Sequence, residues 1–238
     1  MVKRYMAVTI CMFVLLLSGC LYPQSELAKN QMPNEEQLAL IESAVIQYKE
    51  QTNGLVPIKT NSNDVALYEK YVVDFTTLRE AQLINEIPAT AYENGGFYQY
   101  VIITPEDDPR IKLIDLRVTE KIREVYVKLD IYRQKNLYPP FGKQVADGIY
   151  EINYEKLGFK EEPVVISPFS RQELPLLITT DGDVIVDYRF DIQMTIDEHD
   201  LDVAEDEDLR YILEENYPFV PAYSVAYVLE NKEPVFKP

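Results

Sequence analysis

The stretch LPLLITTDGDVIVDY, residues 174–188, decides the fold of this chain. Two β-rich runs, residues 174–179 and 184–188, flank an Asp181-Gly182 pair. Asp-Gly between two such runs is a strong hairpin signal, because both central positions of a type I′ turn require positive φ. The stretch therefore predicts two adjacent antiparallel strands and favours a fold built on antiparallel sheet.

A second hairpin is expected upstream of this one. Residues 97–103 (FYQYVII) are rich in aromatic and β-branched side chains and predict a strand. After an Asp-Asp-Pro turn, residues 112–117 (KLIDLR) alternate well enough to be the returning strand. Further strands are expected at residues 71–75 and 223–229, and the chain after the second of these is expected to be a ragged tail.

Amphipathic runs predict the helices that cover these strands. Apolar side chains recur at helical spacing in residues 35–51, where Asn34 and the acidic residues after it are typical of a helix start. A second run of this kind covers residues 119–132, and a short helix is expected at residues 209–216. The sequence therefore predicts an α+β fold, in which helices pack on small antiparallel sheets.

Two parts of the chain carry similar residues at constant differences in residue number, which predicts an internal duplication of about 80 residues. The matched positions are Gln51, Asn53 and Pro57 with Gln134, Asn136 and Pro140, and Tyr71, Asp74, Phe75 and Leu78 with Tyr150, Asn153, Tyr154 and Leu157. Two similar modules would each lay a helix on a sheet. The alternative is that Tyr, Pro and Asn recur by composition in a Tyr-rich chain.

These patterns divide the chain into five segments. They are a signal peptide at 1–19, a tether at 20–34, a first α+β module at 35–118, a second at 119–196, and an acidic loop, short helix and closing strand at 197–238.

The first twenty residues have the parts of an export signal. A basic start (Lys3, Arg4), an apolar run at residues 6–17 and the tetrapeptide LSGC ending at Cys20 follow one another. The apolar run is too short for a membrane-spanning helix, which needs about 20 residues. The segment resembles the signal of bacterial lipoproteins. That resemblance implies that Cys20 is lipidated, and it places the protein on the cell membrane, facing outside the cytoplasm. An ordinary cleaved signal is the alternative.

Few thiol or imidazole groups that could serve catalysis or metal binding remain beyond this signal. Cys11 lies inside it, so lipidation of Cys20 would leave no free thiol, and His199 is the only histidine. Disulfides, thiol catalysis, cysteine-zinc sites and iron-sulfur clusters are therefore excluded for such a chain. No catalytic residue, cofactor or metal is expected.

The chain is strongly acidic, with a formal net charge of −17 at pH 7. Nucleic acids and anionic lipids both attract basic surfaces, so a body of this charge is expected to be repelled by them. Basic proteins, cations and neutral ligands are the expected partners, although acidity also serves solubility.

Carboxylates supply two hypotheses about chemistry. The acidic run at residues 197–208 suggests calcium binding, but no window in it has the Gly that an EF-hand loop needs, and a solvated loop is the plainer interpretation. Asp183, Asp187 and Asp191 share one side if the segment is a single strand, and a carboxylate pair there could act on a glycan.

Other motifs favour structural roles. The Gly pair in residues 92–96 (YENGG) precedes a strand, so a bulge or hairpin is expected in place of a phosphate loop. Neither Ser167 nor Ser170 lies in a Gly-x-Ser-x-Gly motif. Tyr92, Tyr98 and Tyr100 could line a groove for sugars or peptides, or could be half-buried strand residues.

As a whole the chain resembles uncharacterised lipoproteins of Bacillus-type Gram-positive bacteria, through QTNGLVPI, AYENGGFYQYV, KLIDLR and LENKEPVF. The resemblance implies no known activity. The expected function is a non-catalytic, membrane-anchored binding or assembly role toward a protein or the cell wall. The competing hypothesis is an enzyme that binds or hydrolyses cell-wall glycans with acidic residues.

Overall fold

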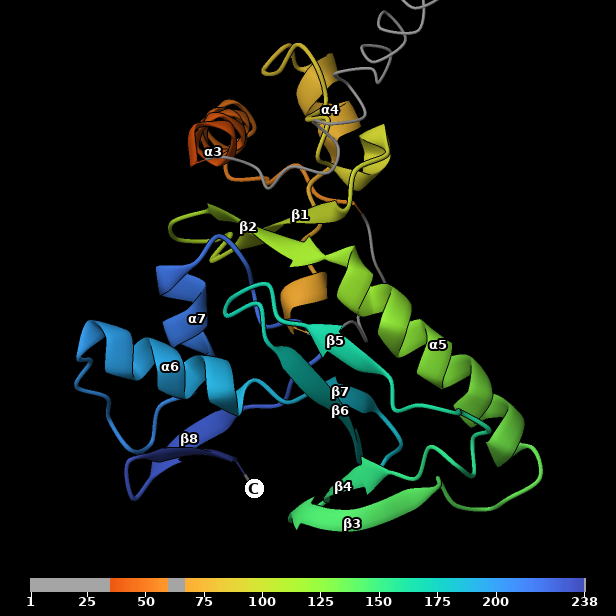
Figure 1. Cartoon of the computed structure of the whole chain (residues 1–238). Helices are drawn as coiled ribbons and strands as arrows, with labels where there is room; N and C mark the ends of the chain where they lie inside the picture. Colours follow the sequence, from red (N-terminus) through yellow and green to blue (C-terminus); the bar gives the residue numbers. More distant parts are fainter. Residues whose placement is uncertain (1–34, 60–66, 238) are drawn as a thin grey trace, which may run out of the picture.

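The structure, a computed structural model, describes residues 35–59 and 67–237 and has an α+β fold (Figure 1). The helices are α3 (Glu35–Gln51), α4 (Phe75–Glu80), α5 (Leu116–Arg133), α6 (Arg189–His199) and α7 (Arg210–Asn216), with 3-10 turns η2 (Leu67–Glu69) and η3 (Tyr92–Asn94). The strands are β1 (Tyr98–Ile103), β2 (Arg110–Asp115), β3 (Phe141–Ala146), β4 (Ile149–Ile152), β5 (Val164–Ile166), β6 (Glu173–Thr179), β7 (Val184–Val186), β8 (Tyr227–Glu230) and β9 (Glu233–Phe236).

The first sheet is the β1–β2 hairpin, which pairs in antiparallel register from Tyr98 with Asp115 to Ile103 with Arg110. Helix α3 packs against β2 and buries Ile41 and Val45 there. This arrangement confirms the predicted helix at residues 35–51 and the predicted upstream hairpin.

The second sheet is organised around β6, which pairs with three strands. The backbone N–H and C=O groups of odd-numbered β6 residues point toward β7, since the Thr179 N–H donates to Asp183 and the Pro175 carbonyl accepts from Asp187. Those of even-numbered residues point toward β4 and β5, so these two strands follow one another along the opposite edge of β6. The Asp181-Gly182 turn joins β6 to β7 with Gly182 at a φ of 94°, so the predicted hairpin is confirmed.

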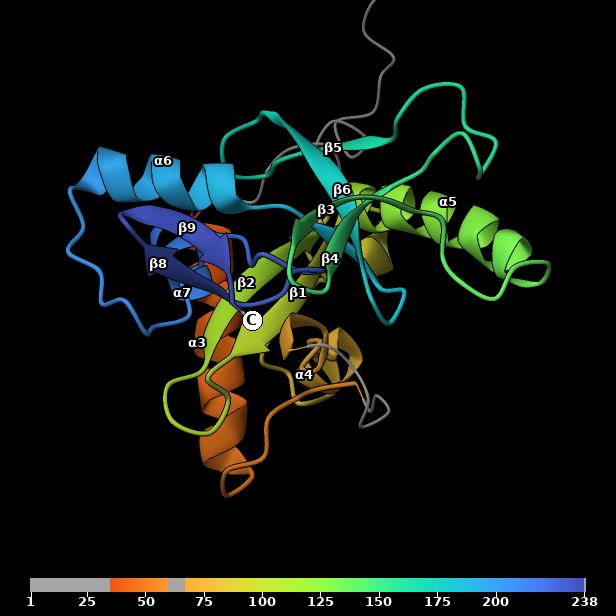
Figure 2. The same ribbon diagram turned by 90° about the horizontal axis from the view of Figure 1, so that it is seen from below.

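The C-terminal hairpin β8–β9 lies beside α6 (Figure 2). The strand predicted at residues 223–229 overlaps β8, but the ragged tail predicted after it is wrong, because β9 forms there. Asn231 and Lys232 both adopt positive φ, at 51° and 70°, and this allows the tight turn that pairs the two strands.

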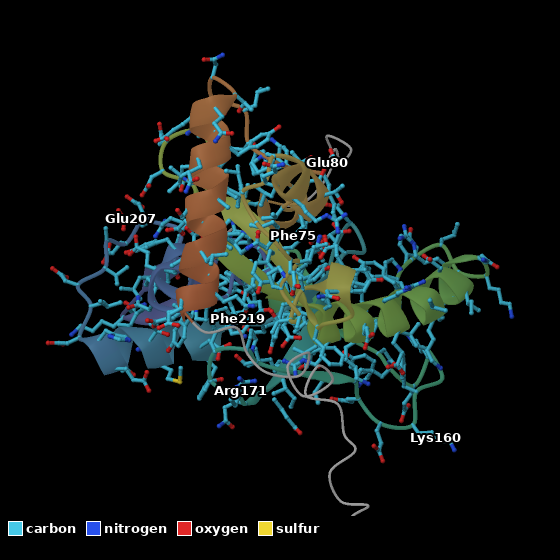
Figure 3. The ribbon with its side chains drawn as sticks, turned by 90° about the horizontal axis from the view of Figure 1, so that it is seen from above. Phe75, Glu80, Lys160, Arg171, Glu207 and Phe219 are labelled. Atoms are coloured by element: carbon cyan, nitrogen blue, oxygen red, sulfur yellow. The ribbon has the colours of Figure 1, made fainter. Side chains whose placement is uncertain are left out.

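One large hydrophobic core extends through both predicted modules. Its members come from α3, the β1–β2 hairpin, α5, the β6 sheet, α6, α7 and the β8–β9 hairpin. Phe75 and Phe219, both deeply buried, lie inside the molecule, whereas Lys160 and Glu207 lie at its opposite edges (Figure 3). The helices and sheets of both predicted modules therefore pack around one shared core.

The strand predicted at residues 71–75 is wrong. Only single bridges form there, Val72 with Val101 and Ile58 with Val73, and helix α4 begins at Phe75. The cause is local: the Asp74 carboxylate accepts hydrogen bonds from the N–H groups of the two residues after Phe75 and so caps a helix.

Two backbone hydrogen bonds join residues at corresponding positions of the two segments that the sequence matched. The N–H of Asp74 donates to the carbonyl of Pro57 at 2.8 Å, and the N–H of Asn153 donates to that of Pro140 at the same distance. The wider units differ, since one holds a two-stranded sheet and the other a five-stranded sheet. The structure therefore does not confirm the duplication, which stays a prediction.

Residues 1–34 lie outside the described part of the chain, and with them the predicted signal, tether and lipidation site at Cys20. Among the helices of residues 35–59 and 67–237, none combines the length and apolar character that a membrane crossing requires.

Candidate ligand-binding groove

Three helices begin with the same local charge pair, in which an Asp carboxylate accepts hydrogen bonds from the Arg two residues later. The pairs are Asp115 with Arg117 at α5, Asp187 with Arg189 at α6, and Asp208 with Arg210 at α7. At α6, Asp187 Oδ1 accepts from the backbone N of Arg189 at 3.1 Å and from its Nε at 2.9 Å, and Oδ2 accepts from Nη2 at 2.6 Å. Both partners are charged, so these are strong hydrogen bonds.

The pair at α6 holds its guanidinium in a fixed and accessible position. The Arg189 guanidinium carbon lies 4.4 Å from the ring centroid of Phe236 on β9, within the range of a cation–π contact. The hydrogen bonds that Arg189 donates to Asp187 raise the pKa of Arg189, so that it remains charged. Asp187 is buried, whereas Arg189 is partly exposed and can reach a ligand.

A cavity of about 760 Å³ opens above this pair, between the start of β6, the first turns of α6 and the β8–β9 turn. Its lining includes Arg189, Phe190, Gln193 and Lys232. Phe190 presents an aromatic face that is 55 % exposed. Cavities of this size suit a small ligand or one segment of a polymer.

The cavity continues across the β6 sheet. A second cavity of about 330 Å³ shares Pro175, Asp187 and Arg189 with the first, and a third of about 370 Å³ shares Glu151 and Glu162 with the second. We refer to the three together as the Arg189 groove. Since Arg189 stands where the first two cavities meet, its side chain borders both of them.

The Arg189 groove is lined by more acids than bases. Seven acidic side chains face three basic ones: Glu151, Glu155, Glu161, Glu162, Glu173, Asp187 and Glu233 against Lys160, Arg189 and Lys232. The groove therefore favours neutral or basic ligand groups and disfavours anionic ones.

Gln193 adds an unsatisfied polar atom to the wall of the first cavity. Its Nε2 donates to Asp197 Oδ1 at 2.9 Å, but its buried Oε1 has no hydrogen-bond partner within the part of the chain that the structure describes. A buried acceptor left without a donor costs about 1–3 kcal/mol. This wall is therefore less stable than a fully hydrogen-bonded one would be.

The predicted alignment of Asp183, Asp187 and Asp191 is wrong. Strand β7 ends at Val186 and helix α6 begins at Arg189, because Asp187 accepts from the Arg189 N–H and starts the helix. Asp183 is exposed at the hairpin turn, Asp187 pairs with Arg189, and Asp191 is fully buried. The structure does not bring them together as a carboxylate pair.

Asp191 instead fixes the turn before β6. Ser167 Oγ lies 2.9 Å from both of its carboxylate oxygens and accepts from the N–H groups of Phe169 and Ser170 at 3.0 and 3.1 Å. Burial raises the pKa of Asp191, although the hydrogen bonds from Ser170 and Ser167 oppose the shift. Ser167 is fully buried, and its contacts are those of a structural residue.

The three tyrosines considered for a groove do not form one. Tyr98 and Tyr100 are buried in the core, where the Tyr100 hydroxyl lies 2.8 Å from Thr90 Oγ1, whereas Tyr92 is exposed. Desolvation raises the pKa of Tyr100 to about 12. The Gly pair before β1 has a structural role, since a Cβ at Gly96 would lie 2.1 Å from the Thr90 carbonyl oxygen.

The acidic run at residues 197–208 is divided by the end of α6, which extends to His199. Asp200 ends that helix in the left-handed conformation. Among residues 35–59 and 67–237, no three His, Cys, Asp or Glu side chains form a group that could hold a metal ion.

Sequence reasoning missed Arg189, although a signal was available. Asp-x-Arg occurs at residues 108–110, 115–117, 187–189 and 208–210, and the last three occurrences lie at the starts of α5, α6 and α7. At residues 187–189 the motif marks the start of α6, which the sequence analysis interpreted as a continuing strand.

The family model for the YphF family N-terminal domain matches residues 34–115, a range that includes α3, α4 and the β1–β2 hairpin. No curated protein and no solved structure matches the chain. The Arg189 groove is lined by residues that lie C-terminal to the matched domain.

Proposed function

We propose that this chain is a membrane-anchored, extracytoplasmic binding protein without catalytic activity, held by a lipid on Cys20, and that the Arg189 groove receives its ligand. The observation that carries the binding role is the Asp187–Arg189 pair, which presents an oriented, partly exposed guanidinium where two cavities meet. The ligand is a neutral or basic extended segment of a protein or of the cell wall, because acids dominate the lining of the groove.

A glycan hydrolase is the competing function, and the contacts of its candidate residues do not favour it. Asp187 accepts from the Arg189 guanidinium with both oxygens, and both Asp191 oxygens lie at hydrogen-bond distance from Ser167. A general acid must hold a proton at working pH and reach the substrate. An ion-paired carboxylate and a buried one do not meet these needs.

Site-directed photo-crosslinking in cells tests the groove. A photoreactive residue replaces Phe190, which is 55 % exposed beside Arg189, and the control position is Leu40 on α3, which is 59 % exposed. We expect a discrete adduct from position 190 only. Equal labelling from both positions, or none from position 190, would contradict the proposal.

Two Arg variants make the test specific. Arg189→Gln removes the guanidinium from the groove, and Arg117→Gln removes the corresponding ion pair from the start of α5. We expect the adduct at position 190 to disappear in the first variant and to persist in the second. Anchoring is tested separately with a tagged fatty acid, and a label that survives Cys20→Ser would refute lipidation at that residue.

A further inference from the structure

Large apolar side chains are exposed at the C-terminal end of α5 and in the loop after it. Leu137 is 94 % exposed and Tyr138 is 72 % exposed, and Val127 and Ile131, one helical turn apart on α5, are each more than half exposed. The end of α5 lies at the edge of the molecule (Figures 1 and 2). We call these four residues the α5 tip.

The α5 tip lies in a basic stretch of an otherwise acidic sequence. Residues 121–143 hold six Lys and Arg against two acidic residues, whereas the whole chain has 23 against 40. Four of these cations are exposed and form no ion pair with any acidic side chain of the described residues: Arg123, Arg133, Lys135 and Lys143. Other cations, such as Arg110, Arg189 and Arg210, are paired.

We propose that the α5 tip lies on the anionic surface of the membrane, with Leu137 and Tyr138 at the level of the lipid headgroups and the flanking cations on lipid phosphates. Exposed apolar side chains flanked by Lys and Arg are the composition of surfaces that bind membrane interfaces. Tyr suits that level because its ring is apolar and its hydroxyl is polar.

The acidity of the remaining chain does not prevent this contact. Charges on the protein are screened over about 10 Å at 0.1 M salt, so the bilayer responds to the nearest side chains more than to the net charge. The acidic remainder is repelled, which favours the orientation with the α5 tip toward the lipid.

The inference rests on the proposed anchoring through Cys20, which brings the body to a bilayer.

The test uses the full lipidated chain in vesicles of phosphatidylcholine with or without phosphatidylglycerol. An environment-sensitive fluorescent amino acid replaces Tyr138, and the control position is Leu55, which is 66 % exposed after α3. We expect a blue shift and quenching by brominated lipids at position 138 alone, stronger with phosphatidylglycerol and weaker with salt. Position 138 behaving like position 55 in both vesicle types would overturn the inference.

Variants and one further measurement distinguish the other outcomes. Leu137→Ser should weaken lipid quenching at position 138 by about tenfold, and Leu40→Ser should leave it unchanged. A blue shift that grows with protein density and lacks lipid quenching would assign the α5 tip to a second copy of the chain and overturn the inference. If Cys20 carries no lipid, the same fluorescence is measured with the chain added to the vesicles from solution. Failure of the anchoring proposal can then be distinguished from failure of the surface-contact proposal.

Discussion

Replacement of Ser167 by Ala tests the network that holds the turn before β6. The change removes the hydroxyl that contacts buried Asp191 and accepts from the buried Phe169 N–H. A hydrogen bond to a charged group contributes about 1.5–3 kcal/mol, and a buried N–H left without an acceptor costs about 1–3 kcal/mol. We therefore expect Ser167→Ala to lower the free energy of unfolding by about 3–5 kcal/mol at neutral pH.

The same network has a defined pH dependence. Burial raises the pKa of Asp191 above its ordinary value of 3.8, so the folded state holds this proton more tightly than the unfolded state. The contribution of Asp191 to stability is therefore full below 3.8 and is lost as pH rises through its folded pKa. A neutral carboxyl needs the Ser167 hydroxyl less than a carboxylate does, so the cost of Ser167→Ala should fall in acid.

Urea unfolding at neutral pH and below the ordinary pKa of Asp measures both effects. Asp191→Asn is the matched control, because an amide cannot ionise and should remove most of the pH dependence of the Ser167→Ala cost. A loss below about 1 kcal/mol at neutral pH would refute the hydrogen-bond argument. An equal loss at both pH values would refute the assignment of the effect to the charge of Asp191.

Three further substitutions, one of them with a matched control, test the packing. Gly96→Ala should prevent stable folding or lower the free energy of unfolding in urea by several kcal/mol, because a Cβ there would lie 2.1 Å from the Thr90 carbonyl oxygen. The control Gly54→Ala should cost only about 1 kcal/mol for its positive φ, because its Cβ would meet nothing within 4 Å. Leu129→Ala should lower stability by about 2–5 kcal/mol, because the side chain is fully buried, and a smaller loss by thermal denaturation would contradict its core position. Tyr227→Phe removes a hydroxyl that joins two buried backbone groups and should cost about 1–3 kcal/mol, with circular dichroism reporting whether the fold persists.

The parts of the fold that the sequence predicted well depend on short-range chemistry. The β6–β7 hairpin follows from its Asp-Gly turn, and helix α3 follows from apolar spacing over 17 residues. The error at residues 184–191 has a physical cause: an alternation of charged and aromatic residues continues past the end of β7, and only the contact of Asp187 with Arg189 starts a helix there. The pattern of polar and apolar residues alone does not predict that contact.

The Arg189 groove could not be predicted in the same way. Its first cavity joins the start of β6, the start of α6 and the β8–β9 turn, and the last of these was expected to be an unpaired tail. Tertiary packing also decided which aromatic residues are accessible. Tyr98 and Tyr100 are buried, whereas Phe190 is exposed.

The Asp-x-Arg pairs have a kinetic consequence for the chain. Each pair links residues two apart, so it can form without closing a long loop, whereas the pairing of β4 with β6 joins strands that are not consecutive in the chain. Helix starts at α5, α6 and α7 can therefore be defined in the folding transition state before the sheets assemble. Removing one of these Arg residues should slow refolding, whereas breaking a contact that closes a longer loop, such as the pairing of β4 with β6, should mainly speed unfolding.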